Sequence, residues 1–286
     1  MEQVITIKDD GYPKLLREIG KEAPKRLYYK GNWNEDIFEN CLAVVGSRHL
    51  TSYGRKMTEQ LVTEIAAAGV TIVSGFMYGG DEAAHKAAVE AGGRTIAVMP
   101  CGIDMIHPAY QEELYNKILE NKGLIISEFE GKFPPANWTY PRRNRIVAGL
   151  SKAVLIIEAG LNSGSLITAD YAKKFGRKIF AVPGPVTSEV SKGTIKLIKE
   201  GAGVATEARD ILKHYNISLA KSNLAKPSLN IGKVEEEIIN QLKREPMGAD
   251  VLARELGMSA AKIGTTLSLM QLKGFIEQEG GKYYVD

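Results

Sequence analysis

The chain has 286 residues, of which 44% are hydrophobic and 25% are charged, and its formal net charge is +3. This composition is typical of a globular protein, and the length predicts one large domain and one small domain. No apolar run reaches the roughly 18 residues that a membrane-spanning helix needs, and the N-terminus lacks the pattern of a secretory signal. Two cysteines, Cys41 and Cys101, are too few for a disulfide framework or a structural zinc site. The sequence therefore predicts a cytoplasmic protein with no membrane insertion, no metal and no cofactor.

Short apolar runs alternate with amphipathic segments between residues 41 and 214. The runs are continuously apolar and rich in β-branched residues, as expected for strands that are buried on both faces. The segments between them place apolar residues about four positions apart and end in glycine, which predicts helices. This alternation predicts an α/β fold with a doubly wound, Rossmann-like, mostly parallel sheet. The predicted strands are 42–46, 70–74, 95–99, 124–127, 153–158 and 179–182.

The two ends of the chain depart from this alternation. Residues 1–40 fit no strand–helix unit, and we expect an N-terminal extension that packs on the sheet domain. The polar stretch 215–232 predicts a linker, and 233–286 predicts a second domain. In that domain three helices precede two short strands around Glu279-Gly280-Gly281, which is typical of a winged helix. The three predicted helices are near 234–244, 250–256 and 260–273.

The loop Gly46-Ser47-Arg48 follows the first predicted strand and leads into a helix. In open parallel sheets, ligands bind in such loops, beyond the carboxyl ends of the strands. Glycine lets the backbone approach a phosphate, the helix dipole favours an anion, and Arg48 can add a bidentate contact. An equally good interpretation is a plain turn in which Arg48 pairs with a surface carboxylate.

Two further loops of this kind lie in the most basic part of the chain, residues 142–199, which hold 11 basic and 3 acidic side chains. Arginines clustered at the start of one helix suit phosphates better than core packing. Small residues and hydroxyls at the start of the next helix form another anion site. The candidate residues are Arg143, Asn144 and Arg145 in the first loop, and Gly164, Ser165 and Thr168 in the second.

Three anion sites on one sheet edge favour a ligand with several phosphates, and a single-stranded nucleic acid fits. Its bases would stack on Trp138 or Tyr140, although these two residues could equally be hydrophobic plugs under the loop. Asp81 and His85 are one helical turn apart, and we expect capping by Asp81 rather than a metal or acid–base pair. Cys101 has no partner histidine in view, so we expect it to pack in the interior. We therefore assign no catalytic residue in these loops.

Ordered blocks of sequence carry a resemblance to a known family. The blocks include VVGSRHLTSYG at 44–54, VSGFMYGGDEAAH at 73–85, YPRRNRIVAGLSKAVLIIEA at 140–159 and SGSLITADYAKKFGRKIFAVPG at 163–184. With these blocks the sequence resembles the DprA/Smf family of DNA-processing proteins, most strongly between Gly11 and Leu212. Two loops depart from the family pattern. Residues 74–81 stand where Ser-Gly-Leu-Ala-x-Gly-Ile-Asp is usual, and His107-Pro108 stands where Tyr-Pro is usual.

The resemblance implies a protein that binds single-stranded DNA and loads a RecA-type recombinase onto it in natural transformation and DNA recombination. It also implies a homodimer without catalytic activity. The family's two DNA-binding motifs fall on Gly46, Ser47 and Arg48, and on Gly164, Ser165 and Thr168.

Two other function classes stay open. One is a nucleotide-processing enzyme of the phosphoribohydrolase type, in which Glu158 is the general base, although a carboxylate that orders neighbouring arginines is the better interpretation. The other is a transcription regulator whose winged helix binds duplex DNA. Residues 228–286 hold 7 basic and 9 acidic side chains, which is unfavourable for phosphate contacts. We therefore expect the tail to be a protein-interaction or accessory module.

Overall fold

The computed structural model describes residues 3–218, 232–272 and 275–285. The chain divides into two compact units, Met1–Leu219 and Ala220–Asp286. This division falls inside the predicted linker, most of which lies outside the described residues. Tyr215, at the start of that stretch, is buried instead, and its hydroxyl donates a hydrogen bond to the carbonyl of Cys41 at 2.8 Å. The first unit therefore extends beyond residue 214.

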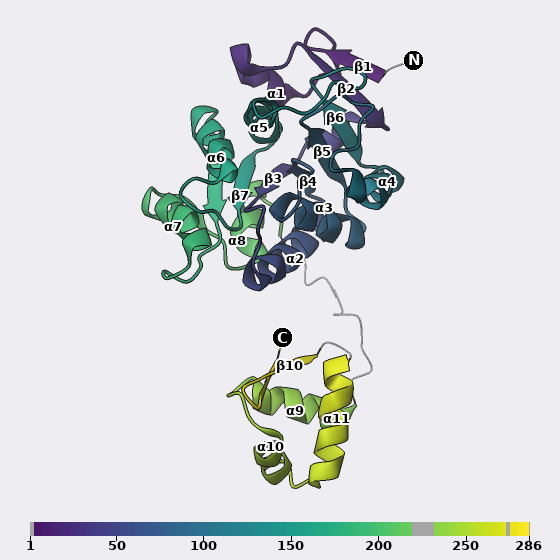
Figure 1. Ribbon diagram of the computed structural model, residues 1–286. Coiled ribbons are helices and arrows are strands. Elements are labelled where there is room, and N and C mark those ends of the chain that lie inside the picture. The colour runs from purple at the N-terminus through teal and green to yellow at the C-terminus, as the bar shows by residue number, and fades with distance from the viewer. Residues whose placement is uncertain (1–2, 219–231, 273–274, 286) are drawn as a thin grey trace. The chain divides into compact units, whose positions relative to one another are not determined.

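The first unit is built on a nine-stranded sheet in the order β1-β2-β6-β5-β4-β3-β7-β8-β9 (Figure 1). The seven strands from β3 to β9 are parallel, and they confirm the predicted α/β fold with a mostly parallel sheet. The strands are β1 (Gln3–Thr6), β2 (Arg26–Gly31), β3 (Cys41–Val45), β4 (Thr71–Ser74), β5 (Thr95–Met99), β6 (Leu124–Ser127), β7 (Ala153–Ile156), β8 (Lys178–Ala181) and β9 (Gly203–Val204).

Helices cover both faces of this sheet (Figure 1). Neighbouring strand residues such as Leu42 and Ala43 point into different cores on opposite faces, which is why the strands read as continuous apolar runs. One face carries α1 (Lys14–Glu18), α5 (Thr139–Leu150), α6 (Gly164–Lys174) and α7 (Lys192–Lys199). The other carries α2 (Ser52–Ala67), α3 (Gly80–Glu90), α4 (Glu112–Glu120) and α8 (Ala208–Leu212).

Residues 1–40 do more than pack on the sheet. β1 and β2 pair with each other, and β2 pairs with β6, so both are antiparallel strands of the sheet itself. Leu16 and Leu27 of this segment are fully buried in the core beneath α5. The extension therefore belongs to the sheet domain, because its strands supply the backbone partners that the outer edge of β6 needs.

The order of the strands reverses at β3. The chain continues from β3 to β4, β5 and β6 on one side and then crosses to β7, β8 and β9 on the other. At the ends of the adjacent strands β3 and β7, Val45 is paired with Ile156. In a doubly wound sheet a crevice opens at such a reversal. The loops after β3 and β7, both predicted as binding loops, therefore leave the sheet side by side.

The second unit has three helices and a hairpin, as the sequence predicts for a winged helix. The helices are α9 (Lys233–Leu242), α10 (Ala249–Glu255) and α11 (Ala260–Leu272). The strands β10 (Ile276–Glu279) and β11 (Lys282–Val285) pair in antiparallel fashion. Ile238, Leu252 and Ile263 form its core. In the described parts of both units, no helix combines the length and the apolar character that crossing a membrane requires.

Candidate functional site

A cavity of about 1030 Å³ opens where the loops after β3 and β7 leave the sheet. Its walls come from these two loops, from the loop after β4, and from the first turns of α5 and α6. Eight of the nine residues predicted from the sequence line it, namely Gly46, Ser47, Arg48, Arg143, Asn144, Gly164, Ser165 and Thr168. The ninth, Arg145, does not.

The loop Gly46-Ser47-Arg48 is held from two sides by backbone contacts. The amide of Ser47 donates to the carbonyl of Glu158 at 2.8 Å, and the amide of Gly80 donates to the carbonyl of Ser47 at 3.0 Å. Gly79 and Gly80 pack directly against the loop. A Cβ on Gly80 would lie 2.7 Å from the Cα of Gly46. Two consecutive glycines at the start of α3 therefore allow the β3 loop to sit close to that helix.

We expect Gly79→Ala to destabilise the first unit more than Gly176→Ala. Both glycines have positive φ, of 81° and 67°, and a side chain in this conformation costs about 1–2 kcal/mol. A Cβ on Gly79 would also overlap the carbonyl oxygens of Ser47 and Arg48, whereas a Cβ on Gly176 meets nothing within 4 Å. This overlap should cost roughly 1–3 kcal/mol more. Urea unfolding followed by tryptophan fluorescence measures the difference, and equal costs would contradict the packing described for the loop.

Arg48 is exposed and lies between two aromatic rings at the cavity wall. Its guanidinium carbon is 5.6 Å from the ring centre of Tyr78 and 5.3 Å from that of Tyr140. Within the described ranges, no carboxylate oxygen lies within 4 Å of an Arg48 nitrogen, so the alternative of a surface ion pair does not hold. Nε2 of His107 lies 2.9 Å from the hydroxyl of Tyr140. Burial, followed by the charge of Arg48, lowers the pKa of His107 and favours its neutral form.

Arg143 lines the cavity, although the residue is only 4% exposed. One of its nitrogens, Nη1, donates to the carbonyl of Val98 at 2.6 Å. A Cβ on Gly75 would overlap the guanidinium, so Arg143 can occupy this position because residue 75 is glycine. Burial lowers the pKa of Arg143, and the charge of Asp81 opposes this effect. The sequence predicts a surface phosphate contact at Arg143, whereas the structure places the guanidinium under the cavity as a buried positive charge.

Asp81 and His85 do not form a metal or acid–base pair. A carboxylate oxygen of Asp81 accepts from the amide of Met77 at 3.3 Å, so it holds the loop before α3 rather than acting as the N-cap of that helix, which is a glycine. Nδ1 of His85 lies 2.7 Å from the hydroxyl of Thr95, and burial lowers the pKa of His85 to about 3. Burial raises the pKa of Cys101 to about 11, which keeps it a thiol. In the described part of the chain, no cluster of three or more His, Cys, Asp and Glu could hold a metal.

Side-chain contacts hold the start of α6, both within its first turn and to α5. Ser163 is the N-cap, and its hydroxyl lies 2.7 Å from that of Ser165. The side-chain amide of Asn144 in α5 donates to the carbonyl of Gly164 at 3.2 Å. Asn144 therefore fixes the two helix starts relative to each other, while Gly164 itself stays exposed.

Three helix N-termini contribute to the cavity wall. Asp81 is in the first turn of α3, Asn144 lies near the start of α5, and Gly164 begins α6. These helices have 11, 12 and 11 residues, and the N-terminus of each carries a partial positive charge with amides that lack helical partners. Together with Arg48 and Arg143, they make the cavity suitable for an anion.

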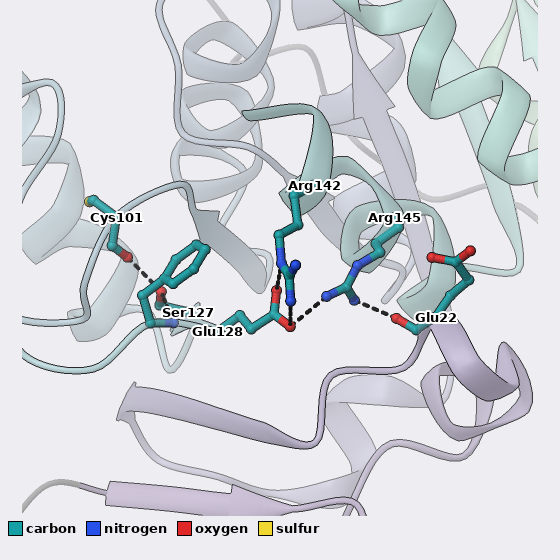
Figure 2. A network of polar contacts seen from close by, with 7 residues as sticks. Glu22, Cys101, Ser127, Glu128, Arg142 and Arg145 are labelled. Carbon is teal, nitrogen blue, oxygen red and sulfur yellow. Dashed lines mark hydrogen bonds and ion pairs between the residues drawn. The ribbon is translucent and has the colours of Figure 1, made fainter. Parts of the chain in front are cut away.

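The position of Arg145 corrects the prediction that Arg143, Asn144 and Arg145 act together at one site. Arg145 lies on the opposite side of α5 from the cavity, where Nη2 contacts a carboxylate oxygen of Glu128 at 2.5 Å (Figure 2). Its Nη1 donates to the carbonyl of Glu22 at 2.5 Å. Arg142 binds the same Glu128 carboxylate through Nε and Nη2, at 2.9 and 3.0 Å. Arg145 therefore joins α5 to the β6 loop and to the N-terminal segment.

The sequence predicts that Glu158 orders the neighbouring arginines, but its carboxylate binds Thr51 instead. One oxygen of its carboxylate accepts from the hydroxyl of Thr51 at 2.5 Å and the other from the amide of Thr51 at 2.9 Å. Thr51 is the N-cap of α2, and a Cβ on Gly54 in the first turn would lie 2.5 Å from the carboxylate. Glu158 is 3% exposed and does not line the cavity. It therefore stabilises the start of α2.

Several polar or aromatic side chains that line the cavity have no role in the sequence analysis, among them Tyr78, His107 and Asn137. Tyr78 and His107 stand exactly in the two loops that depart from the family pattern, and this departure was the available signal. Asn137 precedes α5, which begins at Thr139 rather than after Pro141. These residues extend the cavity wall from the β3 and β7 loops towards the loops after β4 and β5.

The comparison with known families identifies the family of the chain. Residues 3–216 match the family model for DNA recombination-mediator protein A, and residues 223–282 match the DprA winged helix domain. The chain belongs to the DprA/Smf family. The resemblance noted in the sequence is thereby confirmed, and so is the combination of a Rossmann-like domain with a winged helix.

Several DprA/Smf proteins are similar over most of the chain. Protein Smf of Escherichia coli (strain K12) is 38% identical over 278 residues, covering 95% of this chain and 74% of that protein. DNA processing protein DprA of Streptococcus pneumoniae is 41% identical over 210 residues, 73% of each chain. A crystal structure of DprA from the same species has a TM-score of 0.70 at 40% identity and covers 74% of each chain.

The DprA structure from Helicobacter pylori has a TM-score of 0.66 at 32% identity, and covers 76% of this chain and 98% of that one. That structure is described as showing a single-stranded DNA binding mode. The DprA relatives are thus DNA-processing proteins, and the one from Helicobacter pylori binds single-stranded DNA.

Proposed function

We propose that the chain binds single-stranded DNA in the cavity at the carboxyl ends of β3 and β7 and delivers it to a RecA-type recombinase in natural transformation and DNA recombination. The observation that carries this proposal is the exposed guanidinium of Arg48, which lies against two tyrosine rings and has no carboxylate partner in the described part of the chain. Such a group is available for a phosphate, and ring faces suit unpaired bases. The family description as a recombination mediator supports the transfer to a recombinase.

The charge distribution supports single strands over duplex DNA. The winged helix is the unit in which duplex contacts would be expected. However, α11 has Lys262 as its only charged residue, and residues 228–286 are net acidic. Binding to the phosphate backbone needs basic side chains. The first unit, which holds the cavity, is therefore the DNA-binding part of this proposal.

The proposed activity is binding rather than catalysis. The phosphoribohydrolase alternative needs a free carboxylate as its base, but the carboxylate of Glu158 accepts two hydrogen bonds from Thr51. Asp81 lines the cavity, and burial raises its pKa while Arg143 opposes this. The carboxylate of Asp81 accepts a hydrogen bond from the amide of Met77 and so stabilises the loop before α3. These contacts support a binding function.

A homodimer is part of the proposal. Leu161 lines the DNA cavity and also a cavity of about 510 Å³ beside α7, in which Val186 and Ile195 lie among charged side chains. The charged residues there are Lys192, Lys196, Lys199 and Glu200. Leu161 and Val186 are 57% and 79% exposed. A second copy covering these side chains would bring two DNA cavities close together, so that binding of a strand in one raises its effective concentration at the other.

A direct comparison of strands tests the proposed function. We expect the full-length protein to bind a single-stranded oligonucleotide at least about tenfold more tightly than a duplex of the same sequence, and to lose affinity as salt rises. Fluorescence anisotropy at several salt concentrations measures both effects, and light scattering of the same complexes reports whether two protomers share a strand. Equal or tighter binding of the duplex would contradict the proposal.

A further inference from the structure

The first turns of α5 separate two cavities. Pro141, Arg143 and Asn144 line the DNA cavity described above, whereas Arg142 and Arg145 line another cavity of about 540 Å³. Residues three apart share one side of a helix, so Arg142 and Arg145 face away from the DNA cavity. A helix with its side chains is about 10–12 Å wide. Only one helix diameter therefore lies between the two cavities.

The cavity that Arg142 and Arg145 line, which we call the basic groove, has an excess of positive charge. Its basic side chains are Lys21, Lys25, Arg26, Arg142 and Arg145, against the acidic residues Glu22 and Glu128. Glu128 is already bound by Arg142 and Arg145 (Figure 2), and Glu22 pairs with Lys174 at 2.5 Å.

Three of these cations have no such neutralising contact. Lys21, Lys25 and Arg26 are exposed, and no ion pair joins them to any carboxylate of the described chain. They come from the segment that leads into β2, opposite the start of α5. Three free cations in one groove can bind successive phosphates without first breaking an ion pair.

Exposed aromatic rings adjoin the basic groove. Phe129 lines the groove and stacks on Phe133, with ring centres 4.7 Å apart and planes at 11°. Trp138 meets both rings edge to face, at 5.7 and 6.1 Å. Trp138 is 53% exposed and Phe133 is 37% exposed. This aromatic cluster of Phe129, Phe133 and Trp138 is therefore not merely a buried plug under the loop.

We propose that the basic groove and the aromatic cluster form a second contact surface for the same DNA strand that occupies the cavity beside Arg48. Basic side chains that follow the backbone, next to rings on which bases stack, are the features that sequence-tolerant single-strand binders combine. The phosphates lie along Lys21, Lys25 and Arg26, and unpaired bases lie against Trp138 and Phe133. The strand crosses the start of α5 between the two sites. This inference rests on the proposed function and extends it.

The length of the strand provides the test. We compare oligonucleotides of about 4 and about 16 nucleotides, which bracket the site sizes of known single-strand modules. The variant Lys21→Gln/Lys25→Gln/Arg26→Gln should bind the long strand at least about tenfold more weakly and the short strand unchanged. The slope of log affinity against log salt should become shallower by about 2 for the long strand, because each lost phosphate contact removes about 0.7.

A matched variant controls for the loss of net charge. Lys86→Gln/Lys117→Gln/Lys122→Gln also removes three positive charges. Lys86 is in α3, Lys117 is in α4 and Lys122 follows α4; all three are exposed and line neither cavity. We expect it to bind both strands almost as the unmodified protein does. If both triple variants lose the same affinity for the long strand, the effect is one of net charge and the second surface is refuted.

Trp138 itself reports occupancy of the surface. The chain has two tryptophans, so Trp33→Phe leaves Trp138 as the single tryptophan, which can be excited selectively over the tyrosines. We expect the long strand to quench it and the short strand to leave it unchanged. Trp138→Ala should weaken binding of the long strand by about fivefold or more. A strand that binds tightly without changing Trp138 fluorescence would overturn the proposal.

A comparison of the Arg48 variant with the groove variant also separates this inference from the proposed function. Arg48→Ala should weaken binding of both strands. If it does so while the groove variant binds the long strand normally, the second surface is refuted and the DNA cavity stands. If neither variant changes binding of either strand, both proposals fail. If the groove variant loses binding to an acidic peptide but not to the long strand, the groove serves a protein partner and the inference is wrong.

Discussion

Replacing Arg48 by alanine should weaken binding of single-stranded DNA by about tenfold to a hundredfold. A hydrogen bond to a charged group contributes about 1.5–3 kcal/mol, which corresponds to that range of affinity. Arg48 is exposed and already lies between the rings of Tyr78 and Tyr140. A phosphate can therefore bind it without breaking an ion pair, and little side-chain ordering is needed.

The same substitution should leave the fold almost unchanged. Arg48 makes two exposed cation–π contacts, each worth about 0.5–1 kcal/mol, so the free energy of unfolding should fall by no more than about 2 kcal/mol. Arg48→Lys keeps the charge but not the bidentate geometry and should give an intermediate affinity. Arg55→Ala removes an exposed arginine from α2 outside the cavity and serves as the charge control. Equal affinities for Arg48→Ala and Arg55→Ala in an anisotropy titration would refute the assignment of the cavity.

The sheet could be predicted because its physical signal is strong and local. The strands β3 to β8 are buried on both faces, so each appears as a continuous apolar run such as Ala153–Ile156. β1 and β2 lack that signal. Gln3 and Arg26 are exposed, and β2 joins the sheet through residues such as Tyr28, which pairs with Ser127 of β6, 99 residues further along the chain. The antiparallel edge therefore could not be derived from local pattern.

The candidate site could be predicted as loops but not as individual side-chain directions. Gly46 and Gly164 follow strands whose carboxyl ends must meet at one edge of the sheet, and in the structure their loops line one cavity. The direction in which each arginine of α5 points depends on where the helix begins, which is at Thr139. Residues 143 and 145 are 200° apart at 100° per residue and cannot face the same cavity.

Distant partners decide the remaining contacts. Glu128 comes from the β6 loop and Thr51 from the start of α2, and neither is close in sequence to the side chain that it binds. The sequence shows that Arg145 and Glu158 are charged, but not that each is already engaged. That is why Arg145 was assigned to the phosphates and Glu158 to the arginines.

Replacing Glu128 by glutamine should lower the free energy of unfolding of the first unit by about 3–5 kcal/mol. The side chains of Glu128 and Arg145 are 14% and 7% exposed, and removing one partner leaves the other as a buried, uncompensated charge. Arg142 would lose its partner as well, but it is half exposed and can be hydrated. Both tryptophans lie in the first unit, so urea unfolding followed by fluorescence reports this unit. Glu120→Gln, at an exposed glutamate of α4, should change stability by less than about 0.5 kcal/mol.

The pH dependence of this loss distinguishes a charge effect from a packing effect. Burial tends to raise the pKa of Glu128, but the hydrogen bond from Arg142 and the charges of Arg145 and Arg142 outweigh it, so the pKa lies below its usual value. The stabilisation is therefore complete above the pKa of the unfolded chain, about 4.3, and is lost as the pH falls through the lower pKa of the folded chain. Because glutamine does not titrate, the difference in unfolding free energy between the two proteins should be constant near neutral pH and shrink below about pH 4. A difference that stays the same down to the acid unfolding of the unmodified protein would show that the shape of the glutamate, rather than its charge, holds Arg145.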